Sequence, residues 1–375
     1  MIPLVIFVSF FASRQAYKLI HFIGISKRLF SKPNSRSSHE IPVPQFGGVG
    51  LYFSTCITAS VFVALIAFNN FESFFDMVDK PGGVLAFISG LTLIFYTGFV
   101  DDLIDMKAWV KFLFQFTSVA IVVLPTHGYL DNFFGIFGID TLPNTIAIIF
   151  TFFVYLLIIN AFNLIDGIDG LASSLGISAS LFFGVYFSFI NRYDLVILNF
   201  ALIGSLVGFL FSNFSKTKKL FLGDSGSMVI GICIAFQSVQ FMGLSLKFED
   251  ASIISHAPVY ILSVLAYPLI DVLRVMLSRI SKKKSPFMPD RNHIHHKLID
   301  LGMSHIQATA LIIFYTLSLI VITFATKNLS IHWHLLLMMT LALGLAMFPV
   351  ALHKARFRSQ SPENIKPSDD VLKTS

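Results

Sequence analysis

Residues 196–214 read VILNFALIGSLVGFLFSNF and contain no charged side chain. The hydrocarbon core of a bilayer is about 30 Å thick, and an α-helix rises about 1.5 Å per residue, so roughly 20 apolar residues cross it as a helix. A helix also satisfies its backbone polar groups internally, which lipid requires. This stretch therefore predicts a membrane-spanning helix.

Runs of the same apolar character recur along the rest of the chain, which indicates about eleven spans and an all-α polytopic membrane protein. The predicted spans are 1–23, 46–68, 82–100, 109–126, 145–160, 171–190, 196–214, 227–244, 255–278, 307–325 and 332–351. The first run lacks a basic start and a small-residue cleavage site, so we expect it to be a retained span. We expect one integral membrane domain, 1–355, followed by a polar cytoplasmic tail, 356–375.

The composition excludes several classes of protein. Hydrophobic residues make up 55% of the 375-residue chain and charged residues 13%, against about 25% charged in a typical soluble domain. This excludes a soluble globular enzyme and a disordered protein. The two cysteines, Cys56 and Cys233, exclude a disulfide framework and a Cys-rich zinc site.

The basic residues predict the orientation of the spans. With eleven spans, only Lys80, Arg192, Lys247 and Lys327 of the 27 Lys and Arg fall on one side, which leaves 23 on or near the other. Cytoplasmic loops carry the excess of Lys and Arg. We therefore predict an outside N-terminus and an inside C-terminus. The net charge of +6 is explained by this asymmetry, so we expect no nucleic-acid partner.

Acidic residues gather on the same predicted side, next to or between spans. Carboxylates at membrane depth are costly and tend to mark function. A transporter or lipid flippase, which is the rival class, would place ionisable groups near the bilayer midplane. The spans here are mostly Phe, Leu, Ile and Val, so the sequence favours chemistry at the cytoplasmic face. The acidic residues are Asp101, Asp102, Asp105, Asp166, Asp169, Asp224 and Asp290.

Two acidic motifs stand at the ends of predicted spans. In Gly98-Phe-Val-Asp101-Asp102-Leu-Ile-Asp105, helical spacing would put the three carboxylates on one arc. Like charges this close resist joint ionisation, so we expect a cation nearby or a carboxylate that acts as a base. In 160–172, NAFNLIDGIDGLA, two Asp-Gly steps indicate tight turns that present polar side chains. Both motifs could instead be solvated ends of spans.

Two further motifs supply groups for anions and metals. The motif Gly223-Asp224-Ser225-Gly226-Ser227 at a predicted helix start offers free backbone N–H groups and a carboxylate. The alternative is a simple helix cap. The basic loop 279–302 contains HIHH at 293–296, among Lys and Arg that favour a phosphate or a sugar over zinc. Its Lys run alone would also suit anionic lipids.

Together these motifs favour phosphoryl transfer with Mg²⁺. Mg²⁺ is usually held by one or two carboxylates plus substrate phosphates, and phosphoryl transfer depends on positioning and charge neutralisation. A site pressed against the bilayer suggests that one substrate is a lipid phosphate.

From about residue 32 to 302, five separated motifs resemble those of the polyprenyl-phosphate N-acetylhexosamine-1-phosphate transferases (glycosyltransferase family 4). The resemblance implies transfer of a sugar-1-phosphate from a UDP-sugar to undecaprenyl phosphate, with release of UMP. It implies dependence on Mg²⁺, with Mn²⁺ as an alternative, and a bacterial cytoplasmic membrane with the site on its inner face. A homodimer stays open.

The resemblance also implies residue roles. Asp101 and Asp102 match the catalytic pair that activates the lipid phosphate, and Asp224, with Asp101, is expected to bind the metal. The remaining candidates are expected to bind substrate: Arg36, His39, Lys111, Asn163, Asp166, Asp169, Asp290, Arg291, His293, His295 and His296.

The expected donor is UDP-GlcNAc or a close UDP-N-acetylhexosamine. The chain reads His293-Ile-His295-His296, whereas the branch that uses UDP-MurNAc-pentapeptide typically has three consecutive histidines. Asp105 also agrees with the common-antigen branch. The alternatives are the pentapeptide donor and another UDP-N-acetylhexosamine, and a covalent route through an Asp nucleophile stays open.

Overall fold

The computed structural model describes residues 1–27, 30, 43–69, 81–126, 128–246, 256–283 and 292–358. Within these ranges every regular element is a helix, which confirms the all-α prediction. The elements are α1 (Ile2–Ser26), α2 (Gly47–Asn69), α4 (Pro81–Ile104), α5 (Ala108–Thr126), η1 (Ile136–Gly138), α6 (Asn144–Ile165), α7 (Leu171–Phe189), α8 (Tyr193–Asn213), α9 (Gly223–Ser245), α11 (Ala257–Val264), α12 (Ala266–Ile280), α13 (Ile294–Asp300), α14 (His305–Ala325) and α15 (Ile331–Arg358).

The described helices bear out a polytopic membrane protein, with a count slightly below the expected eleven. Nine of them are long and apolar enough to cross a membrane. A tenth span is formed if α11 and α12, which meet at a bend of 74°, are taken together. The run 1–23 forms α1 but is not among these spans, because Arg14, Gln15 and Lys18 interrupt its apolar character.

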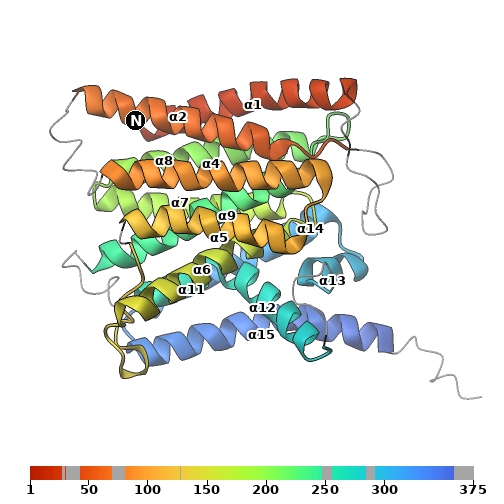
Figure 1. Cartoon of the computed structure of the whole chain (residues 1–375). Helices are drawn as coiled ribbons and strands as arrows, with labels where there is room; N and C mark the ends of the chain where they lie inside the picture. Colours follow the sequence, from red (N-terminus) through yellow and green to blue (C-terminus); the bar gives the residue numbers. More distant parts are fainter. Residues whose placement is uncertain are drawn as a thin grey trace, which may run out of the picture.

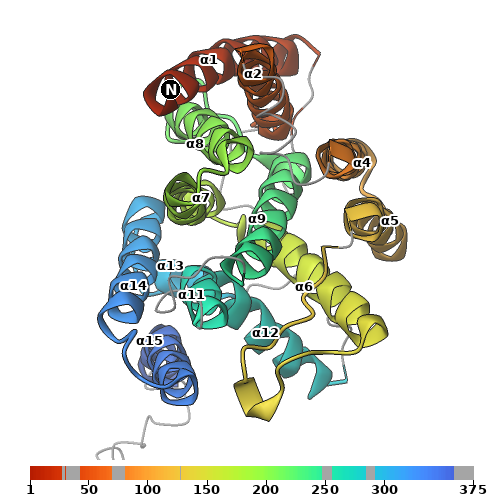
Figure 2. The same ribbon diagram turned by 90° about the vertical axis from the view of Figure 1, so that its left-hand side faces the viewer.

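Helix α9 forms the centre of the molecule. Figure 1 shows most of the long helices running side by side, and Figure 2, seen from one end, shows α9 surrounded by the others. It packs against α2, α4, α6, α7 and α11. In α9, 83% of the most apolar stretch of the helix is buried inside the protein, whereas in the peripheral α15 the buried share is 17%. The core therefore lies around α9, while the outer helices present large apolar side chains outward.

Several helices extend beyond the predicted apolar runs, and the extensions carry polar residues. Helix α4 continues to Ile104, so Asp101 and Asp102 lie in its last turn. Helix α6 continues to Ile165 and includes Asn163, where the sequence had suggested an end at 160. Asp105 lies beyond α4 with a left-handed backbone (φ 53°) and an exposed side chain, so it does not share the predicted helical arc.

Helix α1 begins and helix α15 ends at opposite ends of the helix bundle (Figure 1). Near its C-terminal end α15 contacts the α13 region, because Arg356 donates to the Leu301 carbonyl at 3.0 Å. Helix α15 also runs to Arg358, slightly past the predicted domain boundary at 356. The tail 359–375 lies outside the described residues.

Candidate active site

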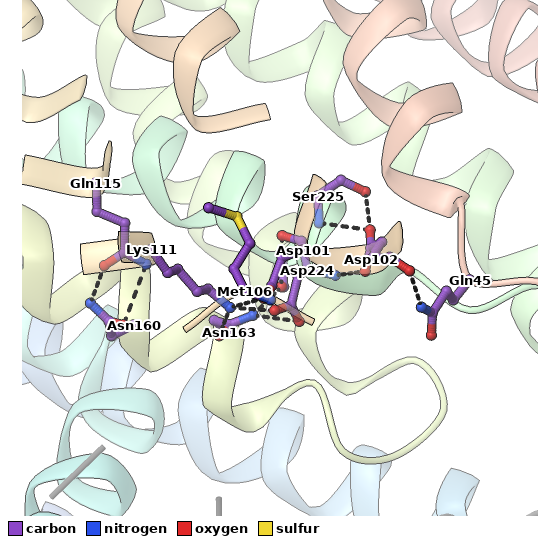
Figure 3. Close-up of polar contacts among 11 residues, drawn as sticks. Gln45, Asp101, Asp102, Met106, Lys111, Gln115, Asn160, Asn163, Asp224 and Ser225 are labelled. Atoms are coloured by element: carbon purple, nitrogen blue, oxygen red, sulfur yellow. Dashed lines mark hydrogen bonds and ion pairs between the residues drawn. The ribbon is translucent and has the colours of Figure 1, made fainter. Parts of the chain in front are cut away.

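The first turn of α9 is capped by a carboxylate from another helix. Asp102 accepts hydrogen bonds from the backbone N–H groups of Asp224 (2.7 Å) and Ser225 (3.1 Å), and from the Ser225 hydroxyl (2.7 Å). A helix N-terminus has unpaired N–H groups and a partial positive charge, so an anion stabilises it. Asp102 therefore joins α4 to α9 (Figure 3).

Glycines allow the helices to approach this turn closely. A Cβ on Gly98 of α4 would lie 2.5 Å from the Ser225 backbone nitrogen, and one on Gly48 of α2 would lie 2.2 Å from the Gly226 nitrogen. Neither contact is possible for a real side chain. Small residues at such crossings let the backbones of membrane helices meet.

Lys111 of α5 lies at the centre of the polar cluster shown in Figure 3. Its ammonium group is 2.8 Å from Asp101 Oδ2 and 3.2 Å from Asn163 Oδ1, and it forms an ion pair with Asp224. Asn163 in turn donates to Asp224 Oδ1 at 3.0 Å and to the Ser227 hydroxyl at 2.9 Å. Four helices thus bring one cation, two carboxylates and an amide together.

The cluster is partly exposed. The Asp224 side chain is 36% exposed, and the Asp101 side chain is 13% exposed. A second pair behind it, Gln115 and Asn160, exchanges amide hydrogen bonds between α5 and α6. That pair packs the helices that carry Lys111 and Asn163.

The donor set suits a hard divalent cation. The described residues contain no group of three or more His, Cys, Asp or Glu placed to share a metal. Two carboxylates, however, already converge on one cation, the Lys111 ammonium. Mg²⁺ takes one or two carboxylates and completes its oxygen shell with waters and substrate phosphates. Asp101 and Asp224 therefore fit Mg²⁺, provided that Lys111 shifts toward a phosphate.

The Asp-Gly loop between α6 and α7 has two carboxylates in different states. Burial, with the charges of Asp224 and Asp169, raises the pKa of Asp166 to about 8. Burial acts in the same direction on Asp169, but hydrogen bonds from His305 (3.0 Å) and Lys219 (2.7 Å) outweigh it and hold the pKa of Asp169 below its usual range. Asp169 is therefore ionised and tied into the structure.

The histidine motif begins a short helix, α13. His293 precedes this helix and has an extended backbone. On a helix, residues two positions apart would point to different sides, but His293 and His295 are not both helical. Their rings stack instead, with centroids 5.5 Å apart and planes 10° apart. His296 lies beside His295, with ring centroids 4.3 Å apart. Burial holds the pKa of His295 well below its usual range, so this ring is neutral at pH 7.

Contacts join the histidines to the acidic loops. A Cβ on Gly167, between Asp166 and Asp169, would lie 2.4 Å from His295 Nε2. The structure therefore places the Asp-Gly loop and the histidine motif in contact. Four predicted substrate-binding residues lie outside the described residues: Arg36, His39, Asp290 and Arg291.

Sequence reasoning missed four residues of this region. Asp271 and Arg274 lie within the predicted span 255–278, and an ion pair in an apolar run is itself a signal of function. Lys219 lies four residues before the motif at 223–227, and its sequence context offered no reason to assign it a role. His305, after Gly302, has no local pattern that marks it, because its partner Asp169 is far away in the chain.

The fold and the site define a polytopic membrane enzyme with acidic and basic groups suited to phosphate chemistry. The chain belongs to glycosyl transferase family 4, whose family model matches residues 84–242. It is 30% identical over 297 residues to the decaprenyl-phosphate N-acetylglucosaminephosphotransferase of Mycolicibacterium smegmatis, covering 75% of this chain and 71% of the relative.

Two further relatives are similar to the same extent. The enzyme of the same name from Mycobacterium leprae is 29% identical, over 75% of this chain and 72% of its own. The undecaprenyl-phosphate alpha-N-acetylglucosaminyl 1-phosphate transferase of Escherichia coli (strain K12) is 29% identical, over 76% of this chain and 72% of its own. The family resemblance found in the motifs is thereby confirmed.

Proposed function

We propose that this protein transfers GlcNAc-1-phosphate from UDP-GlcNAc to undecaprenyl phosphate and releases UMP. The observation that supports the proposal most directly is the cluster of Lys111, Asp101, Asp224 and Asn163, which lies open at one end of a membrane helix bundle. Relatives that cover most of this chain are named for this transfer to decaprenyl or undecaprenyl phosphate.

In the proposed reaction an oxygen of the lipid phosphate attacks the β-phosphorus of UDP-GlcNAc. The new bond joins that oxygen to the β-phosphorus, and the bond between the β-phosphorus and the bridging oxygen breaks, so UMP leaves with that oxygen. Lys111 neutralises a phosphate, and Asp101 orients the lipid phosphate or takes its proton. Asp102 is less suited to that role, because its carboxylate already caps α9.

Asp224 and Asp101 would hold the Mg²⁺ that the proposal requires. When bound, Mg²⁺ neutralises phosphate charge and stabilises the departing UMP.

An apolar cavity supports a lipid acceptor. It has a volume of about 610 Å³ and lies between α6, α9, the bent pair α11–α12 and α15. Its lining is mainly apolar and includes Arg274, which donates to the Asn292 carbonyl before the histidine motif. We infer that part of the polyprenyl chain lies here. The asymmetry of Lys and Arg supports a site on the cytoplasmic face of a bacterial inner membrane.

The proposal is tested with membranes that contain the protein, undecaprenyl phosphate and a panel of radiolabelled UDP-sugars. We expect lipid-linked product and UMP from UDP-GlcNAc, and none from membranes with Asp224→Asn. Product from UDP-MurNAc-pentapeptide alone would move the protein to another branch. Donor-independent movement of the lipid without product would favour the transporter class.

A further inference from the structure

One face of α12 holds the segment that carries the histidine motif. Tyr267, Asp271 and Arg274 are spaced four and three residues apart, so they lie on the same side of this helix. The Tyr267 hydroxyl is 3.3 Å from His295 Nδ1, and Arg274 donates to the Asn292 carbonyl. We refer to these three residues of α12 as the docking strip.

Asp271 is the centre of the docking strip. Its side chain is fully buried and receives three interactions: His293 Nδ1 lies 2.9 Å from Oδ2, and the Ile294 N–H (3.0 Å) and Arg274 Nη2 (2.9 Å) both donate to Oδ1. The carboxylate thus caps the start of α13 and contacts the first histidine at the same time. A buried carboxylate of this kind is stable only because its charge is paired with Arg274.

The contact determines where the proton of His293 lies. An ionised carboxylate can only accept hydrogen bonds, so the imidazole must donate through Nδ1. The ring is then held as the Nδ1–H tautomer, or as the imidazolium, and Nε2 is the nitrogen that this contact leaves unused. His293 stacks on His295, and His295 contacts Gly167. The contact of Asp271 with His293 therefore also sets the position of the histidine motif against the Asp-Gly loop.

We propose that Asp271 is a positioning residue of the reaction, which fixes the tautomer of His293 and thereby directs Nε2 of that ring to the sugar diphosphate. This inference rests on the proposed function for the identity of the donor. The inference is supported by the contacts of one buried carboxylate. Asp271 accepts hydrogen bonds from His293 and Ile294, at the start of the histidine motif, and from Arg274 of α12.

The decisive variant is Asp271→Asn, which has the same shape. Its amide oxygen keeps the two contacts to Ile294 and Arg274 when its NH₂ group faces His293 Nδ1. That nitrogen must then accept, and the proton moves to Nε2. We expect kcat to fall at least about tenfold with little change in the KM for undecaprenyl phosphate, as for a lost transition-state interaction. We also expect ¹⁵N spectra of His293, assigned by difference with His293→Gln, to show the proton change from Nδ1 to Nε2.

A second measurement separates positioning from folding. Leu298 of α13 is buried, so in a background without Cys56 and Cys233 the thiol introduced by Leu298→Cys reacts with a thiol reagent only when α13 undocks. We expect Asp271→Asn to leave this reaction slow. Arg274→Lys serves as the matched variant, because it alters the same strip but leaves the Nδ1–H tautomer of His293 in place.

Three results would overturn the inference. The first is an unprotonated Nδ1 of His293 in the unmodified protein. The second is a switched tautomer in Asp271→Asn with unchanged turnover. The third is a fast reaction of the thiol at position 298 in Asp271→Asn, which would make Asp271 a structural residue. The first and the third result do not depend on the sugar, and a wrong donor assignment is recognised separately by the absence of product in the unmodified protein.

Discussion

Asp101 and Asp102 are neighbours in the chain, but they have different partners. About 100° separates adjacent positions on a helix, so in the last turn of α4 one carboxylate meets Lys111 and the other meets the first turn of α9. Only Asp101 is therefore placed to act on a substrate phosphate, while Asp102 stabilises the helix that carries Asp224.

This division predicts unequal effects of two matched substitutions. Asp101→Asn removes a proposed metal ligand and the partner of Lys111, so we expect activity to fall more than tenfold, which corresponds to more than about 1.4 kcal/mol of barrier. Asp102→Asn keeps one oxygen that can accept from the first turn of α9 and leaves the Lys111 cluster intact, so it is expected to retain more activity. Turnover is measured in membranes at saturating donor, and equal losses would contradict the division.

Asp224→Asn is predicted to abolish turnover because it removes the more exposed carboxylate of the cluster. We expect the residual rate to stay low at any Mg²⁺ concentration. The measurement is a Mg²⁺ titration of the transferase rate, before and after treatment with EDTA. Near-normal turnover at limiting Mg²⁺ would remove Asp224 from the proposed metal site.

The raised pKa of Asp166 predicts a dependence of stability on pH. Between the ordinary carboxyl pKa and about 8, the folded protein holds a proton that the unfolded chain releases. The free energy of unfolding should therefore fall as the pH rises through this range, by at most about 1.4 kcal/mol per pH unit. Above about pH 8 this contribution becomes constant.

The measurement is thermal unfolding in detergent at pH 6 and pH 8, without Mg²⁺ or substrates. Asp166→Asn is neutral at both pH values, so the difference between the two proteins isolates this group from the histidines. An identical pH dependence in the two proteins would show that Asp166 is already ionised in the fold.

At the scale of elements, the site depends on how closely α4 and α2 approach α9. Gly98 and Gly48 contact the backbone of the same turn, and backbone atoms cannot move aside as a side chain can. The polar cluster is therefore assembled by helix packing as much as by its own ion pairs.

Gly98→Ala is predicted to disrupt this crossing. The new methyl group would lie 2.5 Å from the Ser225 nitrogen, and overpacking of this kind costs about 1–3 kcal/mol. We expect lower thermal stability together with lower turnover. Gly243→Ala is the matched control on α9, since a Cβ there meets nothing within 4 Å. A fully active and stable Gly98→Ala would show that α4 can shift without harm to the site.

At the scale of the whole molecule, the catalytic candidates from α4, α5, α6 and α9 meet at one end of the bundle. Arg192 and Lys327, which the charge pattern assigned to the outside, follow the far ends of α7 and α14. Lys218 precedes α9, and Lys283 follows α12, at the end of the bundle that holds the site. Lys80 and Lys247, the other two residues assigned to the outside, are not among the described residues.

Single cysteines test the orientation. In a background without Cys56 and Cys233, we expect an impermeant thiol reagent to label positions 192 and 327 in intact cells. Positions 218 and 283 should be labelled only after the membrane is opened. Strong labelling at position 218 or 283 from outside would reverse the orientation and place the site on the outer face.

The sequence by itself determined the class of fold and most of the candidate residues of the site. Apolar runs of bilayer length form helices, since a helix satisfies its own backbone groups in lipid. In the described residues each predicted run forms one helix, except 255–278, which forms the bent pair α11 and α12. Polar residues such as Asp224 and Asn163 were recognisable because ionisable and amide groups at the ends of apolar runs are costly unless they serve a purpose.

Only the tertiary structure decided which of these groups act together. The pairing of Lys111 with Asp101 and Asp224, the capping of α9 by Asp102, and the contact of Asp271 with His293 each join residues of different elements. Local patterns carry no information on such pairs, because they arise when helices pack and their side chains meet. The roles of neighbouring carboxylates and the tautomer of a histidine therefore follow from packing, and only their candidates from sequence.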